Sequence, residues 1–342
     1  MIAEIADVES LEDLLSEPTE GVCRAVSQME GDVLVLGAAG KMGLTLSRML
    51  KRASVRVGHP MRVIAASRFS SAGSQTLLES WGVDTRSGDL LSEPFLKSLP
   101  KAPNIFYLSG MKFGTSNQES LTWAMNTYLP GRVCEQFPKS RIVAFSTGNV
   151  YPLSPVLHGG SLESDPVEPV GEYAMSCLGR ERIFEHFSRT LGTPVTVLRL
   201  NYAVELRYGV LCDIAQKVYR GEAIDLTMGC VNVLWQGAAN AYAIQALLYA
   251  DSPPTVLNLA GVETLSVRRI AAQFGEWLGK SPQFIGEESP LALLSNAQQT
   301  HALFGYPSVP LHTIMQWVAQ WIRRGKPTLG KPTQFEVRDG RF

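Results

Sequence analysis

Short apolar runs rich in β-branched residues alternate with longer amphipathic stretches over the first two hundred residues of the chain. The runs that predict buried strands are Val33–Leu36, Arg62–Ala66, Ile105–Leu108, Ile142–Ser146 and Val195–Leu200. The stretches 41–52, 74–81, 118–136 and 171–191 have the length and spacing of helices. Continuous apolar strands between helices predict βαβ units, and hence an α/β fold whose parallel sheet is covered on both faces.

After residue 201 the alternation becomes irregular, which divides the expected domain organisation. A helix near 236–250, a strand at Val256–Ala260 and helices near 266–279 and 311–323 suggest a smaller lobe. We expect an acidic helical leader over 1–30, a dinucleotide-binding domain over 31–200, a substrate lobe over 201–325 and a tail over 326–342, and strands can cross between the two domains. In the leader, Ser10 and Asp13 have the spacing of a capping box. The tail is rich in Pro, Gly and charge, so we expect it to be loosely held.

Composition and charge narrow the class of protein. The chain has 342 residues, of which 45% are apolar, and its 31 basic and 32 acidic side chains nearly cancel. This balance argues against a nucleic-acid binder. No apolar stretch approaches the roughly 18 residues that a membrane span needs. The first thirty residues hold eight acids and one arginine, unlike a targeting segment. The five cysteines lie far apart without a CxxC pair, which indicates a reducing compartment, and we expect a cytoplasmic protein.

A glycine-rich turn follows the first predicted strand and opens a helix. The turn has the spacing G-x-x-G-x-x-G, and its candidate cofactor contacts are Gly37, Ala39, Gly40, Lys41, Met42 and Gly43. Glycine lets the backbone approach a pyrophosphate, and the helix N-terminus offers free N–H groups and a partial positive charge. The alternative is a tight strand-to-helix turn without a ligand. The βαβ context favours a dinucleotide.

The residues after the predicted strand Arg62–Ala66, and the Asp89-Leu90 pair further on, bear on the cofactor. NAD enzymes usually place an acid after the second strand, whereas this chain has Ser67 and Arg68 there. From residue 33 to 78 there are seven cations and no acid, so NADP is moderately favoured over NAD. Arg68 could instead lie on the surface. Asp89, followed by Leu90, could bind the adenine amino group or could cap the next helix.

Two further segments carry candidate chemistry and a family resemblance. The predicted strand Ile142–Ser146 leads into a Ser-Thr-Gly-Asn-Val-Tyr run that contains Thr147, and Tyr173 follows near the start of a helix. With the glycine turn, the Asp89-Leu90 pair and the Leu198–Tyr202 strand end, the chain resembles the extended short-chain dehydrogenase/reductase family, in its epimerase/dehydratase branch, over residues 31–325. The resemblance implies a Rossmann-type doubly wound parallel sheet, a smaller C-terminal substrate lobe and often a homodimer.

The chemistry that the resemblance implies needs a proton moved at the oxygen of the carbon that exchanges the hydride. Thr147 would hold the substrate oxygen and Tyr173 would donate or accept the proton. A tyrosine with a pKa of about 10 does this near neutral pH only if a cation stabilises its phenolate. The family's Tyr-x-x-x-Lys pattern supplies that cation, but here the position is Cys177. A neutral thiol cannot replace the lysine. The alternative roles are packing for Tyr173 and strand-end hydrogen bonds for Thr147.

A loop lysine is the candidate replacement. The predicted strand Ile105–Leu108 is followed by a segment that contains Ser109, a candidate cofactor contact, and Lys112. Loops at the carboxyl ends of parallel strands share one edge of the sheet, so Lys112 leaves on the side of Thr147 and Tyr173. The segment resembles the Gly-x-Lys loop of progesterone-5β-reductase-like and iridoid-synthase-like enzymes. Their following His-Tyr is Phe113-Gly114 here, so their enone reduction is not carried over. The alternative is a solvated lysine.

Substrate contacts are expected from Asn149, Asn201 and Arg207, which the resemblance places around the cleft. Arg207 could equally form an ion pair, and the nearby Trp235 could be plain core. The histidines lack metal-ligand spacing, so we assign no metal, and no G-x-S-x-G elbow supports a hydrolase.

Two functions follow from these motifs. The first is an NAD(P)-dependent oxidoreductase or epimerase/dehydratase-like enzyme acting on a small polar, sugar-like molecule. The second is a catalytically inactive dinucleotide-binding redox sensor or regulator. The retained tyrosine and threonine favour the first.

Overall fold

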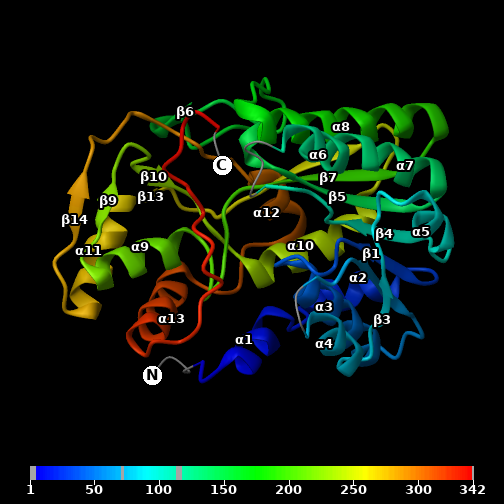
Figure 1. The fold of residues 1–342 in the computed structure, drawn as a ribbon, viewed down its shortest axis with the longest axis horizontal. Helices are drawn as coiled ribbons and strands as arrows, with labels where there is room; N and C mark the ends of the chain where they lie inside the picture. The colour runs from blue at the N-terminus through cyan, green and yellow to red at the C-terminus, as the bar shows by residue number, and fades with distance from the viewer. Residues whose placement is uncertain (1–4, 71–72, 113–117, 341–342) are drawn as a thin grey trace.

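The chain is organised around a seven-stranded parallel sheet, as a computed structural model of residues 5–70, 73–112 and 118–340 shows (Figure 1). The strands lie in the order β12-β7-β5-β4-β1-β2-β3, and all six neighbouring pairs are parallel. This is the Rossmann-type order of six strands extended by one further strand, β12. The strands are β1 (Val33–Leu36), β2 (Val63–Ser67), β3 (Asp84–Ser87), β4 (Asn104–Tyr107), β5 (Arg141–Thr147), β7 (Val195–Leu200) and β12 (Thr255–Leu259). The predicted α/β fold class is confirmed.

Helices cover both faces of the sheet because its central strands are apolar on both sides. Every residue of β1 and β4 is buried. On one face lie α2 (Glu20–Ser27), α3 (Gly43–Arg56), α4 (Ser74–Ser80) and α10 (Gln236–Ala246). On the other lie α5 (Glu93–Ser98), α7 (Leu129–Gln136) and α8 (Gly171–Leu191). Before α7 the chain forms α6 (Glu119–Trp123) and a π-helical turn over Ala124–Tyr128. No helix in the described part of the chain is long and apolar enough to cross a membrane.

A second, smaller core lies beside the sheet, at the opposite end of the molecule from β3 (Figure 1). Its main elements are α9 (Val210–Arg220), α11 (Val267–Leu278), α13 (Leu311–Arg323), β9 (Ala223–Asp225) and β14 (Gln283–Ile285). Short pairs complete it: β8 (Ala203–Val204) with β11 (Leu234–Trp235), β10 (Cys230–Val231) with β13 (Leu265–Ser266), and β6 (Ser154–Pro155) with β15 (Leu291–Ala292). Helix α12 (Gln298–Phe304) packs on β12. Single-turn 3₁₀ helices cover Gly148–Val150, Val156–His158 and Leu247–Tyr249.

The expected lobe over 201–325 contains one segment that belongs to the sheet domain; the crossing strand is as expected, whereas the helix before it is a correction. The stretch assigned to the lobe as a helix near 236–250 and a strand at Val256–Ala260 forms α10 and β12, which belong to the sheet domain. Strand β12 is the edge strand beside β7, and α10 packs on α2 and α3. The physical reason is visible in the sequence, because α10 is buried nearly all round and needs a large apolar surface on every side.

The acidic leader forms two helices rather than one and joins the two cores. The N-cap residue of helix α1 (Val8–Leu15) is Asp7, whose carboxylate accepts from the Ser10 amide. The prediction that Ser10 opens this helix is therefore wrong. Apolar side chains of α1 pack in the smaller core, whereas those of α2 pack under the sheet. The acids of the leader meet the basic face of α3 in the ion pairs Asp13–Arg48, Glu17–Arg52 and Glu17–Arg56.

The tail is firmly packed, contrary to the expectation of a loosely held end. Phe335 is 2% exposed and belongs to the core of the lobe. The Thr333 amide and hydroxyl both donate to Asp213, at 2.7 and 2.6 Å. The Arg338 guanidinium donates to two backbone carbonyls of the lobe. The tail therefore runs from the lobe to the start of α8, where Gly340 lies against Gly171, and it is the long red segment in Figure 1.

Candidate active site

The glycine turn between β1 and α3 has a separate geometric reason for each of its glycines. Gly37 has a φ of +84°, and a Cβ there would lie 2.7 Å from the Ser109 amide nitrogen. A Cβ on Gly43 would lie 2.5 Å from the Ala38 carbonyl oxygen. On Gly40, the only described atom within 4 Å of a Cβ would be the Gly37 carbonyl oxygen, at 3.3 Å. Gly37 and Gly43 let the chain pack closely on itself, and Gly40 leaves an open surface that fits the pyrophosphate of a dinucleotide.

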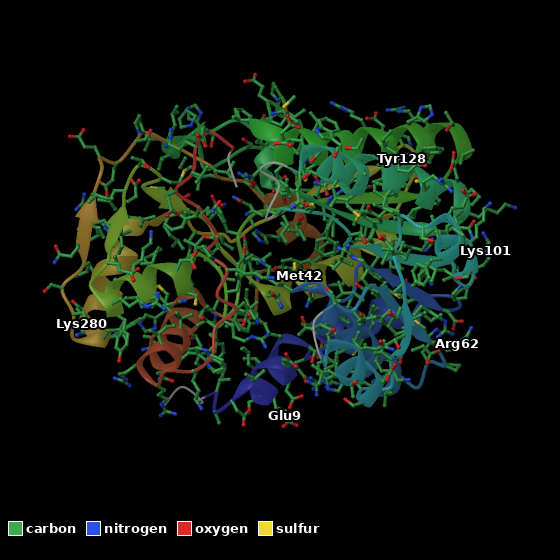
Figure 2. The ribbon with its side chains drawn as sticks, in the orientation of Figure 1. Glu9, Met42, Arg62, Lys101, Tyr128 and Lys280 are labelled. Atoms are coloured by element: carbon green, nitrogen blue, oxygen red, sulfur yellow. The ribbon has the colours of Figure 1, made fainter. Side chains whose placement is uncertain are left out.

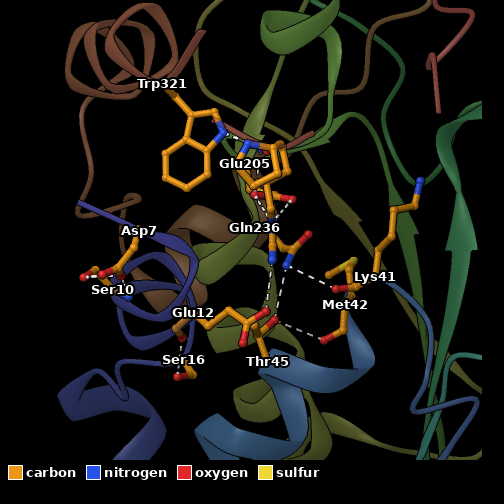
Figure 3. Close-up of polar contacts among 12 residues, drawn as sticks. Asp7, Ser10, Glu12, Ser16, Lys41, Met42, Thr45, Glu205, Gln236 and Trp321 are labelled. Atoms are coloured by element: carbon orange, nitrogen blue, oxygen red, sulfur yellow. Dashed lines mark hydrogen bonds and ion pairs between the residues drawn. The ribbon is translucent and has the colours of Figure 1, made fainter. Parts of the chain in front are cut away.

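Helix α3 starts directly behind this surface. Among the described residues no side chain caps its N-terminus at Met42. The turn is tied to α10 instead, because the Gln236 side-chain amide donates to the Lys41 carbonyl and to the Thr45 hydroxyl, at 3.4 and 3.2 Å (Figure 3). Asn240 also donates to the Thr45 hydroxyl, at 2.9 Å. The N–H groups of the first turn of α3 therefore have a fixed place at the sheet edge, where an anionic group can meet them.

The ends of β2 and β3 lie at the same edge of the sheet. Ser67 is half-buried and pairs in register with Ser87, and Arg68 is exposed. Asp89 is exposed and accepts from the amide of Leu91, whereas Leu90 is buried. The Asp89 carboxylate therefore closes a local turn before α5 (Glu93–Ser98) and does not cap that helix, whose N-cap residue is Ser92; its binding to an adenine amino group stays a prediction.

A cavity of about 170 Å³ lies beside the glycine turn, between the carboxyl edge of the sheet and the lobe. Figure 2 labels Met42, one of its lining residues, at this junction of the two cores. The three predicted catalytic residues, Thr147 from β5, Tyr173 from α8 and Lys112 after β4, all line this cavity. The further lining residues are Lys41, Met42, Ser146, Asn149, Leu200, Asn201, Tyr202, Ala203, Tyr208, Val210, Gln236 and Thr333.

Thr147 is held in place by its neighbours at the end of β5. Its side chain is 7% exposed. Its hydroxyl donates to the Asn149 side-chain oxygen at 3.1 Å and accepts from the Asn149 amide at 3.2 Å. It also bonds to Tyr173, and that hydrogen bond lowers the pKa of the tyrosine. The threonine hydroxyl and the phenol therefore converge on one point of the cavity wall.

The loop lysine stands beside the tyrosine. The Lys112 Nζ lies 5.9 Å from the centroid of the Tyr173 ring. Burial lowers the pKa of Lys112 to about 8, against the attraction of Cys177 and Asp213. Lys112 is therefore protonated at neutral pH and loses its charge within the range in which an enzyme can be assayed.

The surroundings of Tyr173 raise the pKa of its phenol. Burial is the largest effect and raises the pKa of Tyr173, and Cys177 raises it further. The charge of Arg180 and the hydrogen bond with Thr147 lower it. The phenol therefore holds its proton strongly in the free protein, and any use of the phenolate depends on the cations nearby.

The structure brings Lys41, a predicted cofactor contact, to the cavity and adds Thr333, which sequence reasoning missed. The Lys41 Nζ, expected only at the cofactor, lies 3.1 Å from the centroid of the Tyr208 ring. Burial lowers the pKa of Lys41 to about 7, and repulsion from Lys112 and Lys331 contributes. Thr333 of the tail forms part of the cavity wall. Sequence spacing gives no signal for Thr333, because it lies 160 residues after Tyr173 and reaches the site only through the fold.

Two predicted residues have structural partners instead of facing the cavity. Arg207 does not line the cavity: its guanidinium is bound to Glu205, at 3.1 Å, and to Glu12, at 3.0 Å. The ion pair, and not a substrate contact, accounts for it. Trp235 packs against Trp317 with ring centroids 5.8 Å apart, which is the core alternative. Asn149 and Asn201 do line the cavity, and Asn201 donates to Asn232 at 2.9 Å.

A glycine turn at the carboxyl edge of a doubly wound sheet, beside a tyrosine, a threonine and a lysine in one cavity, defines a dinucleotide-dependent enzyme of the short-chain dehydrogenase/reductase type. The NAD dependent epimerase/dehydratase family model matches residues 33–205, and the chain belongs to this family. The match ends after β8, so most of the lobe, the tail, and α10 and β12 of the sheet domain lie outside it.

Solved structures share the fold at low sequence identity. A UDP-glucuronic acid 4-epimerase from Bacillus cereus, bound to NAD, is 17% identical with a TM-score of 0.70, over 86% of this chain and 99% of its own. A dTDP-glucose 4,6-dehydratase from Streptomyces venezuelae, also bound to NAD, is 18% identical with a TM-score of 0.72, over 86% of this chain and 97% of its own. A UDP-glucose 4-epimerase from Thermus thermophilus is 17% identical with a TM-score of 0.70. No curated protein sequence matches the chain.

Proposed function

We propose that this enzyme catalyses hydride transfer between a nicotinamide dinucleotide and a secondary alcohol or carbonyl carbon of a small polar, sugar-like molecule. The observation that carries the proposal is the convergence of Tyr173, Thr147 and Lys112 on one cavity beside the glycine turn. The small volume of the cavity, about 170 Å³, and the polar side chains in its wall favour a compact, hydroxylated substrate.

The proposed roles follow from the positions of the side chains. The dinucleotide, when bound, supplies or accepts the hydride at the substrate carbon. In the reductive direction the substrate oxygen gains the Tyr173 proton as the carbon gains the hydride, and in the oxidative direction both leave. Thr147 orients the substrate oxygen by hydrogen bonding. Protonated Lys112 stabilises the phenolate that Tyr173 becomes, which is the work of the helix lysine in the family pattern.

The dinucleotide would lie along the glycine turn, with its pyrophosphate at Gly40 and the first turn of α3. We favour NADP over NAD because Ser67 ends β2, exposed Arg68 follows it, and no acid lies between residues 33 and 78. Four of the seven cations between residues 33 and 78 already form ion pairs, so they do not add support for a 2′-phosphate site. Arg48, Arg52 and Arg56 pair with the leader, and Arg62 pairs with Asp32.

The test is a turnover assay with the full chain. Ketones, aldehydes and sugars are offered with NADP(H) and with NAD(H), and the absorbance of reduced nicotinamide is followed. We expect turnover with at least one carbonyl or polyol class, and a loss of about 10³-fold in Tyr173→Phe, whose ring keeps its shape but holds no proton. Tight dinucleotide binding without turnover on any class, or a Tyr173→Phe variant as active as the wild type, would overturn the proposal and favour a regulatory dinucleotide-binding protein.

A further inference from the structure

Helix α8 carries a second cation on the face that presents the tyrosine. Tyr173, Cys177 and Arg180 are spaced i, i+4 and i+7 and so share one side of the helix. Arg180 is 6% exposed. Its guanidinium donates to the Phe145 carbonyl at 2.6 Å and to the carbonyl and side-chain oxygens of Asn126, at 3.3 and 2.7 Å. These acceptors are all neutral, so Arg180 keeps a full positive charge beneath the site.

Asn126 passes this anchorage to the loop that carries Lys112. Its side-chain oxygen accepts from the Met111 amide at 2.8 Å, and its side-chain nitrogen donates to the Met111 carbonyl at 3.0 Å. The same nitrogen donates to the Ser176 hydroxyl at 2.9 Å. Both backbone polar groups of the residue before Lys112 are therefore fixed by one buried amide, which is itself fixed by Arg180.

The loop also lies directly on the guanidinium. A Cβ built on Gly110 would stand 2.4 Å from an Nη of Arg180 and 3.1 Å from the Asn126 side-chain oxygen. Glycine is therefore required at this position by close contact, since a Cβ cannot be placed there without a shift of the loop or of the arginine. The loop and the arginine fit each other without room for a further atom.

No acid in the described part of the chain forms an ion pair with Arg180, although the charge of Glu181 helps to raise the pKa of Arg180. Glu181, the next residue along the helix, pairs with Arg199 at 2.7 Å and accepts from the Ser146 hydroxyl. A buried guanidinium held only by neutral oxygens is costly unless its charge or its hydrogen bonds are used. In this site both are used, because the charge lowers the pKa of Tyr173 and the hydrogen bonds fix the loop.

We propose that Arg180 is a positioning residue that, through Asn126, fixes the 109–112 loop so that Lys112 stands beside Tyr173. The inference rests on the proposed function, in which Lys112 supplies the charge for Tyr173. It explains how α8 can place a cation beside Tyr173 although Cys177 stands at the usual lysine position. Arg180 of α8 fixes the loop that carries Lys112, and Lys112 supplies the charge.

The test measures the reactivity of the Lys112 amine, which needs no substrate. The full chain is labelled with a trace of acetic anhydride over pH 6–11, and the modification of Lys112 is followed by mass spectrometry. The variants are Arg180→Met, Arg180→Lys and Gly110→Ala, with Arg182→Met as the control on the same helix, where Arg182 is exposed and pairs with Glu185. Kd for the dinucleotide, and kcat/KM over the same pH range, are measured beside it.

In Arg180→Met and in Gly110→Ala we expect the midpoint of Lys112 labelling to rise by one pH unit or more, as the released amine becomes an ordinary solvated lysine. We expect kcat/KM to fall tenfold or more with little change in Kd, an intermediate effect in Arg180→Lys, and none in Arg182→Met. Gly110→Ala keeps the test decisive if Arg180→Met fails to fold, because it changes the loop and leaves the buried charge in place.

Unchanged labelling and unchanged kcat/KM in folded Arg180→Met, or in Gly110→Ala, would overturn the inference while the proposed function stood. A wild-type enzyme without turnover would defeat the proposed function, whereas the labelling would still report whether Arg180 holds the loop.

Discussion

The two edges of this active site are built in different ways. The glycine turn between β1 and α3 is a backbone device, and its three glycines meet the geometric demands that their spacing implies. The catalytic face of α8 is a side-chain device, and here the usual lysine position is Cys177 while cations come from a loop and from a deeper turn of the helix. A backbone site cannot be moved to other residues, whereas a charge can be supplied by any element that reaches the same sheet edge.

The largest test of this comparison returns the charge to the helix. In a chain that carries Lys112→Met, the second change Cys177→Lys is expected to restore kcat/KM by a few tens of fold, because position 177 lies one turn from Tyr173 on the same face. Steady-state kinetics of the single and double variants make the measurement. Cys177→Ser in the same background is the matched control and should restore nothing. An equal gain from serine would show that charge is not what position 177 supplies.

The glycine turn is tested by two substitutions, each of which adds one methyl group to a glycine. Gly40→Ala places a Cβ in the open surface of the turn, so we expect dinucleotide Kd to rise about tenfold with an unchanged Tm. Gly43→Ala places its Cβ 2.5 Å from the Ala38 carbonyl oxygen, so we expect a loss of about 1–3 kcal/mol in the free energy of unfolding. Titration of NADP(H) and thermal unfolding give the two values. A Gly40→Ala variant with wild-type Kd would remove the pyrophosphate from this turn.

The smallest expected effect concerns the end of β2. Arg68→Asp should shift the ratio of the Kd values for NADP and NAD toward NAD by several-fold, because a carboxylate repels a 2′-phosphate and accepts from a 2′-hydroxyl. Arg62→Met is the control, because Arg62 pairs with Asp32 away from this corner. An unchanged ratio in Arg68→Asp would place Arg68 on the surface without a role in cofactor choice.

The sequence predicted the sheet and the glycine turn because both depend on local pattern, whereas the catalytic roles of Tyr173, Thr147 and Lys112 stay predictions. Strands β1 and β7 have the predicted bounds, and Lys112 reaches the cavity because parallel strands end at one edge. The errors come from tertiary context. Helix α10 and strand β12 were assigned to the lobe because chain order alone does not say which core an apolar segment joins. The tail was expected to be loose because its composition does not reveal the fixed partners of Thr333 and Phe335.

Charge was the weakest guide to function. A run of cations without acids suggested a phosphate site, but most of these arginines pair with acids of the leader and with Asp32. The sequence pattern, by contrast, does not single out Arg180, since a lone arginine in a helix is most often exposed to solvent. Its importance is visible only from its burial and from the loop that lies on it.

The most direct measurement is the ratio of kcat/KM between the wild type and Lys112→Met as a function of pH. We predict a ratio of about 10² at pH 7. The pKa of Lys112 is lowered to about 8, so its charge is lost as the pH rises through that value and the ratio should shrink above it. A ratio near one at pH 7, or one that stays constant from pH 7 to 10, would contradict the account.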